Sequence, residues 1–167
     1  MKKRTKHQAD YLNPITIGAL AFILRLWNTI AQGNDFYANF LSDASTYRVW
    51  ASKLAAGGSY GEPVFQMGPL YPYFLAQNLK LGISNYATLF IQAIFGALVA
   101  VLVYYIAKNI FDKKAALISG LLTAIYAPFI FYDGLLLSES IQIFLLTAAL
   151  FILLSNFKKR FLLRLFL

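Results

Sequence analysis

Four long apolar runs constrain the fold of this 167-residue chain more than any other feature. They cover about 14–31, 86–108, 115–131 and 135–156, and an α-helix needs about 17–25 residues to cross the hydrocarbon core of a bilayer. Because a backbone in lipid must satisfy its own hydrogen bonds, such runs fold as helices. The sequence therefore predicts an all-α integral membrane protein with about four transmembrane helices.

The composition agrees with this class and argues against others. Hydrophobic residues make up 59% of the chain and charged residues only 13%, whereas soluble domains have about 25% charged residues. The net charge of +8 does not indicate a nucleic-acid partner, because Lys and Arg cluster beside the apolar runs, as topology signals do. The absence of cysteine excludes disulfides and thiolate metal sites. A single histidine, His7, argues against a multi-histidine metal site.

The positive residues divide the chain and indicate its orientation. A basic tail covers 1–13, the membrane domain covers 14–156, and 157–167 is a second basic tail or the start of a truncated further element. Four positive residues lie in the first tail, three in the turn 108–114 and four after residue 156. By the positive-inside rule, both termini and that turn are cytoplasmic in a multi-pass membrane protein. The first apolar run is longer than that of a signal peptide, so we expect an uncleaved span.

This orientation places the long loop, about 32–84, and the turn 132–140 on the outer side. Within the loop, 43–56 has helical periodicity, with an apolar face at i, i+3, i+4 and i+7. That face consists of Tyr47, Trp50, Ala51 and Leu54.

Local signals mark where this loop helix and its neighbour begin and end. Ser42 or Asp43 is the expected N-cap and Gly57-Gly58 the expected stop. Pro69 and Pro72 are expected to break regular structure twice, and 73–81 is typical of a short apolar helix. We expect amphipathic helices of this kind to lie in the membrane interface rather than to cross it.

Two acidic residues on the outer side are candidates for chemistry. Asp43 begins the loop helix, where a carboxylate acts either as a general base or metal ligand or only as a helix cap. Glu139 lies about one turn inside the fourth run, where it either faces a polar cavity or stands at the water boundary, favoured by the helix dipole. Asp133, followed by Gly134, is typical of a turn.

Other residues also allow two interpretations. Arg25 lies inside the first span, where its side chain either reaches the outer interface or faces the bundle interior and pairs with an acid or a phosphate. The loop aromatics, including Tyr47, Trp50 and Tyr71, either pack in the interface or form a platform for a lipid chain or a sugar ring. Gly96 and the alanines around it predict a close helix contact.

Taken in order, these residues resemble the bacterial integral-membrane glycosyltransferases of the GT-C fold, of the protein mannosyltransferase and aminoarabinose-transferase type. The resemblance covers nearly the whole chain. The motifs that carry it are Leu24-Arg25-Leu26-Trp27, Asp43-Ala44-x-x-Tyr47-x-x-Trp50-Ala51, Gly57-Gly58, Val64-Phe65-x-x-x-Pro69-Leu70-Tyr71-Pro72-Tyr73-Phe74-Leu75, Gln92-Ala93-x-x-Gly96-Ala97, Tyr104-x-Ile106-Ala107-Lys108 and Leu137-Ser138-Glu139.

The resemblance implies transfer of a sugar from a polyprenyl-phosphate donor to a lipid, glycan or protein acceptor outside the cytoplasmic membrane. It gives Asp43 the catalytic or metal-associated role and Glu139 a part in the acceptor or metal site, with a divalent metal ion as an optional cofactor. It also implies an arginine that holds the lipid phosphate. The expected substrate contacts are Arg25, Arg48, Tyr47, Trp50 and Tyr71.

Members of this family are several times longer, so we expect this chain to be the N-terminal portion of a larger enzyme. The segment Phe157–Leu167 is then the edge of a further element. The alternative is a small, non-catalytic membrane protein that scaffolds a partner subunit. On that interpretation Asp43 is only a helix cap and the outer loop is a docking surface.

Overall fold

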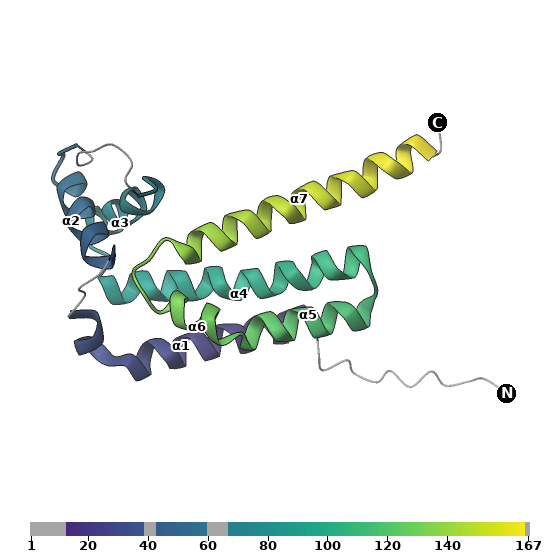
Figure 1. The fold of residues 1–167 in the computed structure, drawn as a ribbon, viewed down its shortest axis with the longest axis horizontal. Helices are drawn as coiled ribbons and strands as arrows, with labels where there is room; N and C mark the ends of the chain where they lie inside the picture. Colours follow the sequence, from purple (N-terminus) through teal and green to yellow (C-terminus); the bar gives the residue numbers. More distant parts are fainter. Residues whose placement is uncertain (1–12, 39–42, 60–66, 166–167) are drawn as a thin grey trace.

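The computed structural model describes residues 13–38, 43–59 and 67–165, and within these ranges the chain forms helices joined by short turns. The helices are α1 (Pro14–Ala38), α2 (Asp43–Ala55), α3 (Leu70–Lys80), α4 (Asn85–Ile110), α5 (Lys113–Ile125), α6 (Ala127–Asp133) and α7 (Glu139–Leu165). Helices α1, α4, α5 and α7 form an elongated bundle, and α2 and α3 gather at one end of it (Figure 1).

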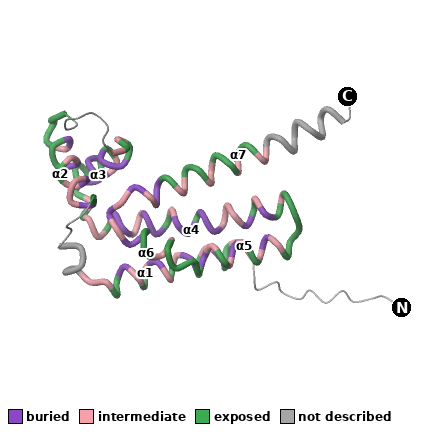
Figure 2. Tube along the Cα trace, in the orientation of Figure 1, coloured by how far each residue is buried: buried purple, intermediate pink, exposed green. Residues whose placement is uncertain are grey.

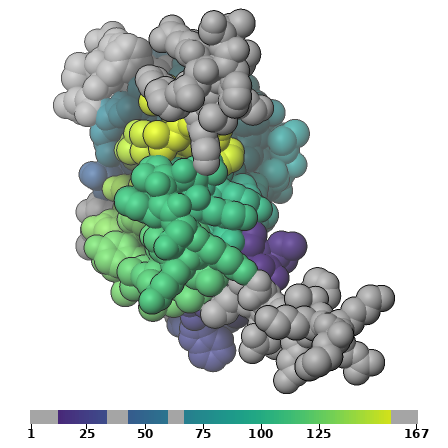
Figure 3. Space-filling model, turned by 90° about the vertical axis from the view of Figure 1, so that its right-hand side faces the viewer, coloured from purple at the N-terminus to yellow at the C-terminus, as the bar shows by residue number. Residues whose placement is uncertain are grey.

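Helix α4 is the centre of the bundle, because it contacts α1, α5 and α7. Its buried positions run along most of its length, while residues 142–155 of α7 are exposed or half-buried (Figure 2). Seen from the end that holds the α4–α5 turn, α7 lies above that turn and the start of α1 lies beside it (Figure 3). The connection between α6 and α7 lies at the opposite end, next to α2 and α3 (Figure 1).

The described helices confirm an all-α membrane protein but not four complete spans. Pro14–Gly33 and Asn85–Ile110 are each long and apolar enough to cross a bilayer, and α5 and α6 add a third span if this pair, bent by 49°, crosses as one. The predicted fourth run contributes the shorter apolar helix Glu139–Ser155 among the residues searched. The start of α1, the α4–α5 turn and the end of α7 share one end, as the charge distribution predicts, whereas the cytoplasmic facing of that end stays a prediction (Figure 1).

The predicted third run is broken at Tyr126, whose backbone is extended (φ −66°, ψ 107°). Pro128 explains the break, because proline has no N–H to donate to the carbonyl four residues earlier and its ring crowds that carbonyl. That carbonyl belongs to Ala124, and the side chain of Arg25 donates to it instead, at 3.3 Å. Asn28 supports the next segment in the same way, donating to the carbonyl of Ile130 at 3.1 Å. Polar side chains of α1 therefore bind the backbone on both sides of the break.

A buried ion pair joins the helices at this level. Arg25 is only 1% exposed, and its Nε lies 2.6 Å from Oδ2 of Asp133. The Arg25 Nη1 also donates to the carbonyl of Ala21 at 3.0 Å, and the hydroxyl of Ser140 donates to the other oxygen of Asp133. The contact links α1, α5, α6 and α7. The structure confirms the second interpretation of Arg25, in which its side chain faces the bundle interior and pairs with an acid.

This ion pair corrects the prediction that Asp133 only forms a turn. Asp133 does precede a turn at Gly134, but its side chain is buried and bound by Arg25 and Ser140. The sequence signal was correct for the backbone only. An unpaired charge at this depth would be costly, so the carboxylate turns inward to its counter-ion.

The small-residue face of α4 makes room for buried side chains of other helices. Gly96 lies directly against the ion pair, and a Cβ placed there would overlap the carboxylate of Asp133 and the guanidinium of Arg25. A larger side chain on α4 would therefore displace the pair. Farther along the bundle, Gly120 does mediate a close contact, since a Cβ there would lie 3.1 Å from Ile17 and Tyr104.

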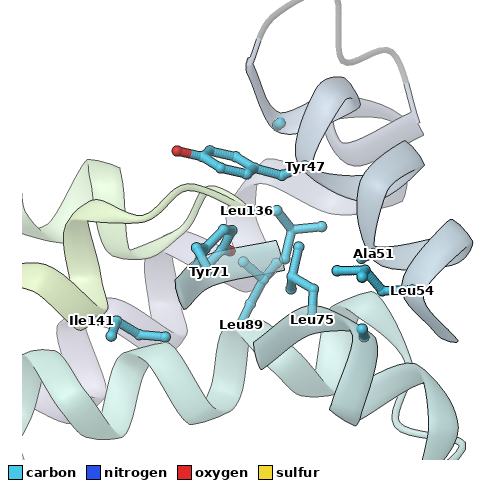
Figure 4. Packing of buried hydrophobic residues seen from close by; sticks show 10 residues of the cluster. Tyr47, Ala51, Leu54, Tyr71, Leu75, Leu89, Leu136 and Ile141 are labelled. Atoms are coloured by element: carbon cyan, nitrogen blue, oxygen red, sulfur yellow. The ribbon is translucent and has the colours of Figure 1, made fainter. Parts of the chain in front are cut away.

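The described part of the predicted outer loop forms two helices, α2 and α3, which together we call the cap. The predicted loop helix appears as α2, and its buried face consists of Ala44, Tyr47, Ala51 and Leu54. This face packs on α3, α4 and the α6–α7 connection through Leu75, Leu89 and Leu136 (Figure 4). Protein therefore covers the apolar face, while Trp50 is only partly buried at its edge. The predicted position of this helix in the membrane interface stays a prediction.

The ends of the cap helices show one correct stop signal and one wrong break signal. Gly57 adopts φ 84°, a left-handed conformation that glycine favours, and the N–H of Gly58 donates to the carbonyl of Lys53, which ends α2 as predicted. The predicted second break at Pro72 is wrong, because α3 begins at Leu70 and Pro72 lies in its first turn. Proline is tolerated there, since the first N–H groups of a helix have no partner within it.

We predict that Gly96→Ala destabilises the protein, because the added methyl group forces the buried ion pair apart. Overpacking alone costs about 1–3 kcal/mol, so the midpoint of thermal unfolding in detergent should fall. Gly68→Ala is the matched control, because a Cβ at Gly68 meets no atom within 4 Å. Equal midpoints for the two variants would contradict the account of Gly96.

We also predict strong coupling between Arg25 and Asp133. Arg25→Gln or Asp133→Asn alone leaves the other charge buried without its partner, which costs about 3–5 kcal/mol. The double variant carries no uncompensated charge, so it should be less destabilised than the sum of the two single variants. Thermal unfolding of the four proteins forms a double-mutant cycle. Additive effects would show that the two side chains do not depend on each other.

Candidate functional site

Most of the predicted outer-loop residues meet where α2, α3 and the start of α7 come together (Figure 4). The rings of Tyr47 and Tyr71 pack edge to face, with centroids 4.9 Å apart. The hydroxyl of Tyr47 donates to the Oγ of Ser138 at 3.3 Å. Trp50 continues the row on α2, with its ring 6.4 Å from that of Tyr47. Two of the three predicted aromatic contacts are thus packed inside the cap.

Tyr71 is tied to the centre of the bundle through Gln92. Its hydroxyl donates to Gln92 Oε1 at 2.6 Å, and the amide nitrogen of Gln92 donates to the carbonyls of Asp133 (3.1 Å) and Leu135 (2.6 Å). Burial raises the pKa of the Tyr71 phenol, and the carboxylate of Glu139 and the phenol of Tyr47 raise it further. Tyr71 therefore stays protonated at neutral pH and acts as a hydrogen-bond donor.

Glu139 is the first residue of α7 and lies close enough to Tyr71 to affect its pKa. Its Oε2 atom is enclosed and has no hydrogen-bond partner among the described residues. The serines on either side are both engaged, Ser138 with Tyr47 and Ser140 with Asp133. An enclosed acceptor without a donor is uncommon in folded proteins. This oxygen is therefore suited to a hydroxyl group or a cation that comes from outside the described chain.

Asp43 is the first residue of α2, and its side chain is exposed. It lies four residues before Tyr47, so the two side chains share one face of the helix. The bond from Tyr47 to Ser138 connects this face to the residue that precedes Glu139. An acidic residue in the first turn is also favoured by the helix dipole. The alternative N-cap, Ser42, lies outside the described residues.

The two predicted phosphate-binding arginines are not part of this cluster of Tyr47, Tyr71 and Glu139. Arg25 is connected to it indirectly, through Asp133 and then Gln92 or Ser140. Arg48 lines a separate hollow between α2, α3 and the start of α4.

Few side chains near this cluster could bind a divalent cation. The described residues contain no group of three or more His, Cys, Asp or Glu that could hold a metal ion. Mg²⁺, however, keeps several waters and is often bound by one or two carboxylates together with substrate phosphates. Asp43 and Glu139 fit only this second kind of site.

Sequence reasoning gave no separate role to Gln92, Ser140 or Asn28, although all three make buried or half-buried hydrogen bonds. One signal was available, because each is a polar residue inside or at the edge of an apolar run. Polar side chains at such depth usually bind each other or a backbone carbonyl. Which partner each one takes depends on the helix packing, and the sequence does not specify it.

Comparison with known proteins gives one match. The family model described as dolichyl-phosphate-mannose-protein mannosyltransferase matches residues 66–167, which is more than half of the chain. The matched part contains α3 to α7, and with them Tyr71, Gln92, Asp133 and Glu139. No curated protein and no solved structure matches the chain. The extent of the family match shows that this chain belongs to the dolichyl-phosphate-mannose-protein mannosyltransferase family of GT-C membrane glycosyltransferases.

Proposed function

We propose that the cap and the first turn of α7 form part of the active site of a membrane glycosyltransferase. The donor is a sugar linked to a polyprenyl phosphate, and the acceptor is a hydroxyl group of a glycan, lipid or protein at the outer face of the cytoplasmic membrane. The observation that carries the proposal is the enclosed oxygen of Glu139, which lies beside Tyr71 and has no hydrogen-bond partner in the described part of the chain. The family match supports the reaction class.

The reaction is an inverting transfer. The acceptor oxygen attacks the anomeric carbon of the sugar, a new glycosidic bond forms, and the bond from that carbon to the phosphate oxygen breaks. The acceptor proton passes to a carboxylate, and the lipid phosphate leaves with the electron pair. Asp43 is the proposed base, because it is exposed and can meet an incoming hydroxyl group.

Glu139 has a complementary role in this proposal. Its free oxygen accepts a hydrogen bond from the acceptor or from the sugar and so orients the reacting group. The two segments that carry the acids are held together by the bond between Tyr47 and Ser138. Tyr71 stays protonated beside Glu139, so it adds no negative charge to the site. The partly buried edge at Trp50 is the proposed platform for a sugar ring or lipid chain.

The negative charge of the donor phosphate also needs a counter-charge. Arg25 already neutralises Asp133, and Arg48 lies away from Glu139, so neither arginine is well placed for this task at the Tyr47–Tyr71–Glu139 cluster. A divalent cation held by Asp43 or Glu139 would supply this charge and bind the phosphate oxygens. The chain's own contribution is then to place the carboxylates, exclude water with the aromatic rings and accept the proton.

We predict that Asp43→Asn reduces transfer by about 100-fold or more, the usual range for a general acid or base, and that Glu139→Gln also reduces transfer, because the charged acceptor that orients the reacting group is lost. The assay is the transfer of radiolabelled mannose from polyprenyl-phosphate mannose to acceptors in membranes that contain the protein. Asp112→Asn is the matched control, because Asp112 caps α5 at the opposite end and asparagine also caps well. Transfer at the wild-type rate by Asp43→Asn would rule out Asp43 as the base.

A further inference from the structure

A hollow of about 60 Å³ opens between α2, the second half of α3 and the start of α4. Its apolar wall is formed by Ala51, Leu75 and Leu79, and its polar wall by Arg48, Ser52, Asn85 and Thr88. Figure 4 shows Leu75 beside Ala51 on the side of the cap away from Tyr47.

This hollow is separate from the Tyr47–Tyr71–Glu139 cluster. Leu75 and Leu79 follow Tyr71 by one and two helical turns, which corresponds to about 6 and 12 Å along α3. On α2, Arg48 and Ser52 lie on a different face from Asp43 and Tyr47, since residues four apart share a face and adjacent residues do not. A ligand in the hollow would therefore not reach Glu139.

Several hydrogen-bond donors of the polar wall have no partner among the described residues. The ion pair formed by the described residues uses Arg25 and Asp133, so the guanidinium of Arg48 has no carboxylate partner in that part of the chain. The side chains of Ser52 and Asn85 also make no hydrogen bond there. The hydroxyl of Thr88 is already used, because it donates to the carbonyl of Ser84 at 3.1 Å and accepts from Asn78 at 3.2 Å.

The size and charge of the hollow suit a phosphate group. One water molecule needs about 10–15 Å³ in the same measure of volume, so 60 Å³ holds a compact group of a few oxygen atoms. The guanidinium fork of arginine matches two oxygens of a phosphate, and none of the described residues that line the wall carries a carboxylate to repel an anion. Leu79, which lines the hollow, is 39% exposed, so apolar surface is available for an attached chain.

We propose that this hollow is an accessory site for the phosphate of an anionic lipid headgroup, separate from the site of sugar transfer. The phosphate is bound by Arg48, Ser52 and Asn85, and the start of the lipid chain lies on Leu79. The lipid would hold α2, α3 and α4 together at the end of the bundle. This site does not depend on transferase activity, so it can be tested without a glycosylation assay.

The test is ligand-induced stabilisation of the purified protein in a neutral maltoside detergent. We expect short-chain phosphatidic acid to raise the unfolding midpoint in a saturable way, whereas diacylglycerol with the same chains has no effect. Arg48→Gln should weaken the apparent affinity at least tenfold. Lys53→Gln, which removes an exposed charge of α2 that does not line the hollow, should keep the wild-type affinity. Arg48→Lys should lie between them, because lysine keeps the charge but loses the fork.

The outcomes separate the proposal from its rivals. Equal loss in the Arg48 and Lys53 variants would mean general attraction to anions and would overturn it, as would the absence of saturable stabilisation in the wild type. Inorganic phosphate is tested in parallel, and if it stabilises at the same concentration as phosphatidic acid, the ligand is a free phosphate and the lipid assignment is wrong. Unfolding without ligand shows whether Arg48→Gln is folded, and Ser52→Ala provides a second, milder variant with a smaller expected loss.

Discussion

The contact between the guanidinium of Arg25 and the carboxylate of Asp133 is the one on which the rest of the bundle depends. Both charges are buried at the level where α5 gives way to α6, and neither is tolerable there alone. The pair holds α1 to the end of α6, and Ser140 adds the first turns of α7. Gln92 then carries the connection outward to Tyr71. The position of Glu139 thus follows from a charge pair inside the bundle.

Adjacent residues at the start of α7 have different roles: two hold the fold together, and the one between them is the proposed ligand contact. Ser138 and Ser140 bind neighbouring elements, and Glu139 between them keeps an oxygen to which no described residue donates a hydrogen bond. A carboxylate fixed on both sides loses little freedom when it binds a ligand, which favours precise orientation. The aromatic pair of Tyr47 and Tyr71 gives the same segment an apolar surrounding that excludes water.

The sequence predicted the class of the fold, because apolar length and charge placement are properties of single segments. It predicted α2 and its stop at Gly57 for the same local reason. It could not predict that Asp133 turns inward or that Pro72 is accepted in a first helical turn, since both depend on what surrounds the backbone. Nor could it choose between the two interpretations of Arg25, because the partner lies 108 residues away. The chemical assignments of Asp43 and Glu139 remain predictions, although the structure connects their two segments.

Gly96 also sets the rotation of α4 about its own axis. The absent side chain must face the ion pair, and Gln92, one turn earlier on the same face, must at the same time reach the carbonyls of Asp133 and Leu135. Inserting one residue between these two positions would turn one of them away by about 100°, since a helix has 3.6 residues per turn. The spacing of four residues from Gln92 to Gly96 therefore fixes the rotation of α4 against the helices around it. Substitutions that preserve volume are tolerable along this face, whereas a change in chain length between these positions is not.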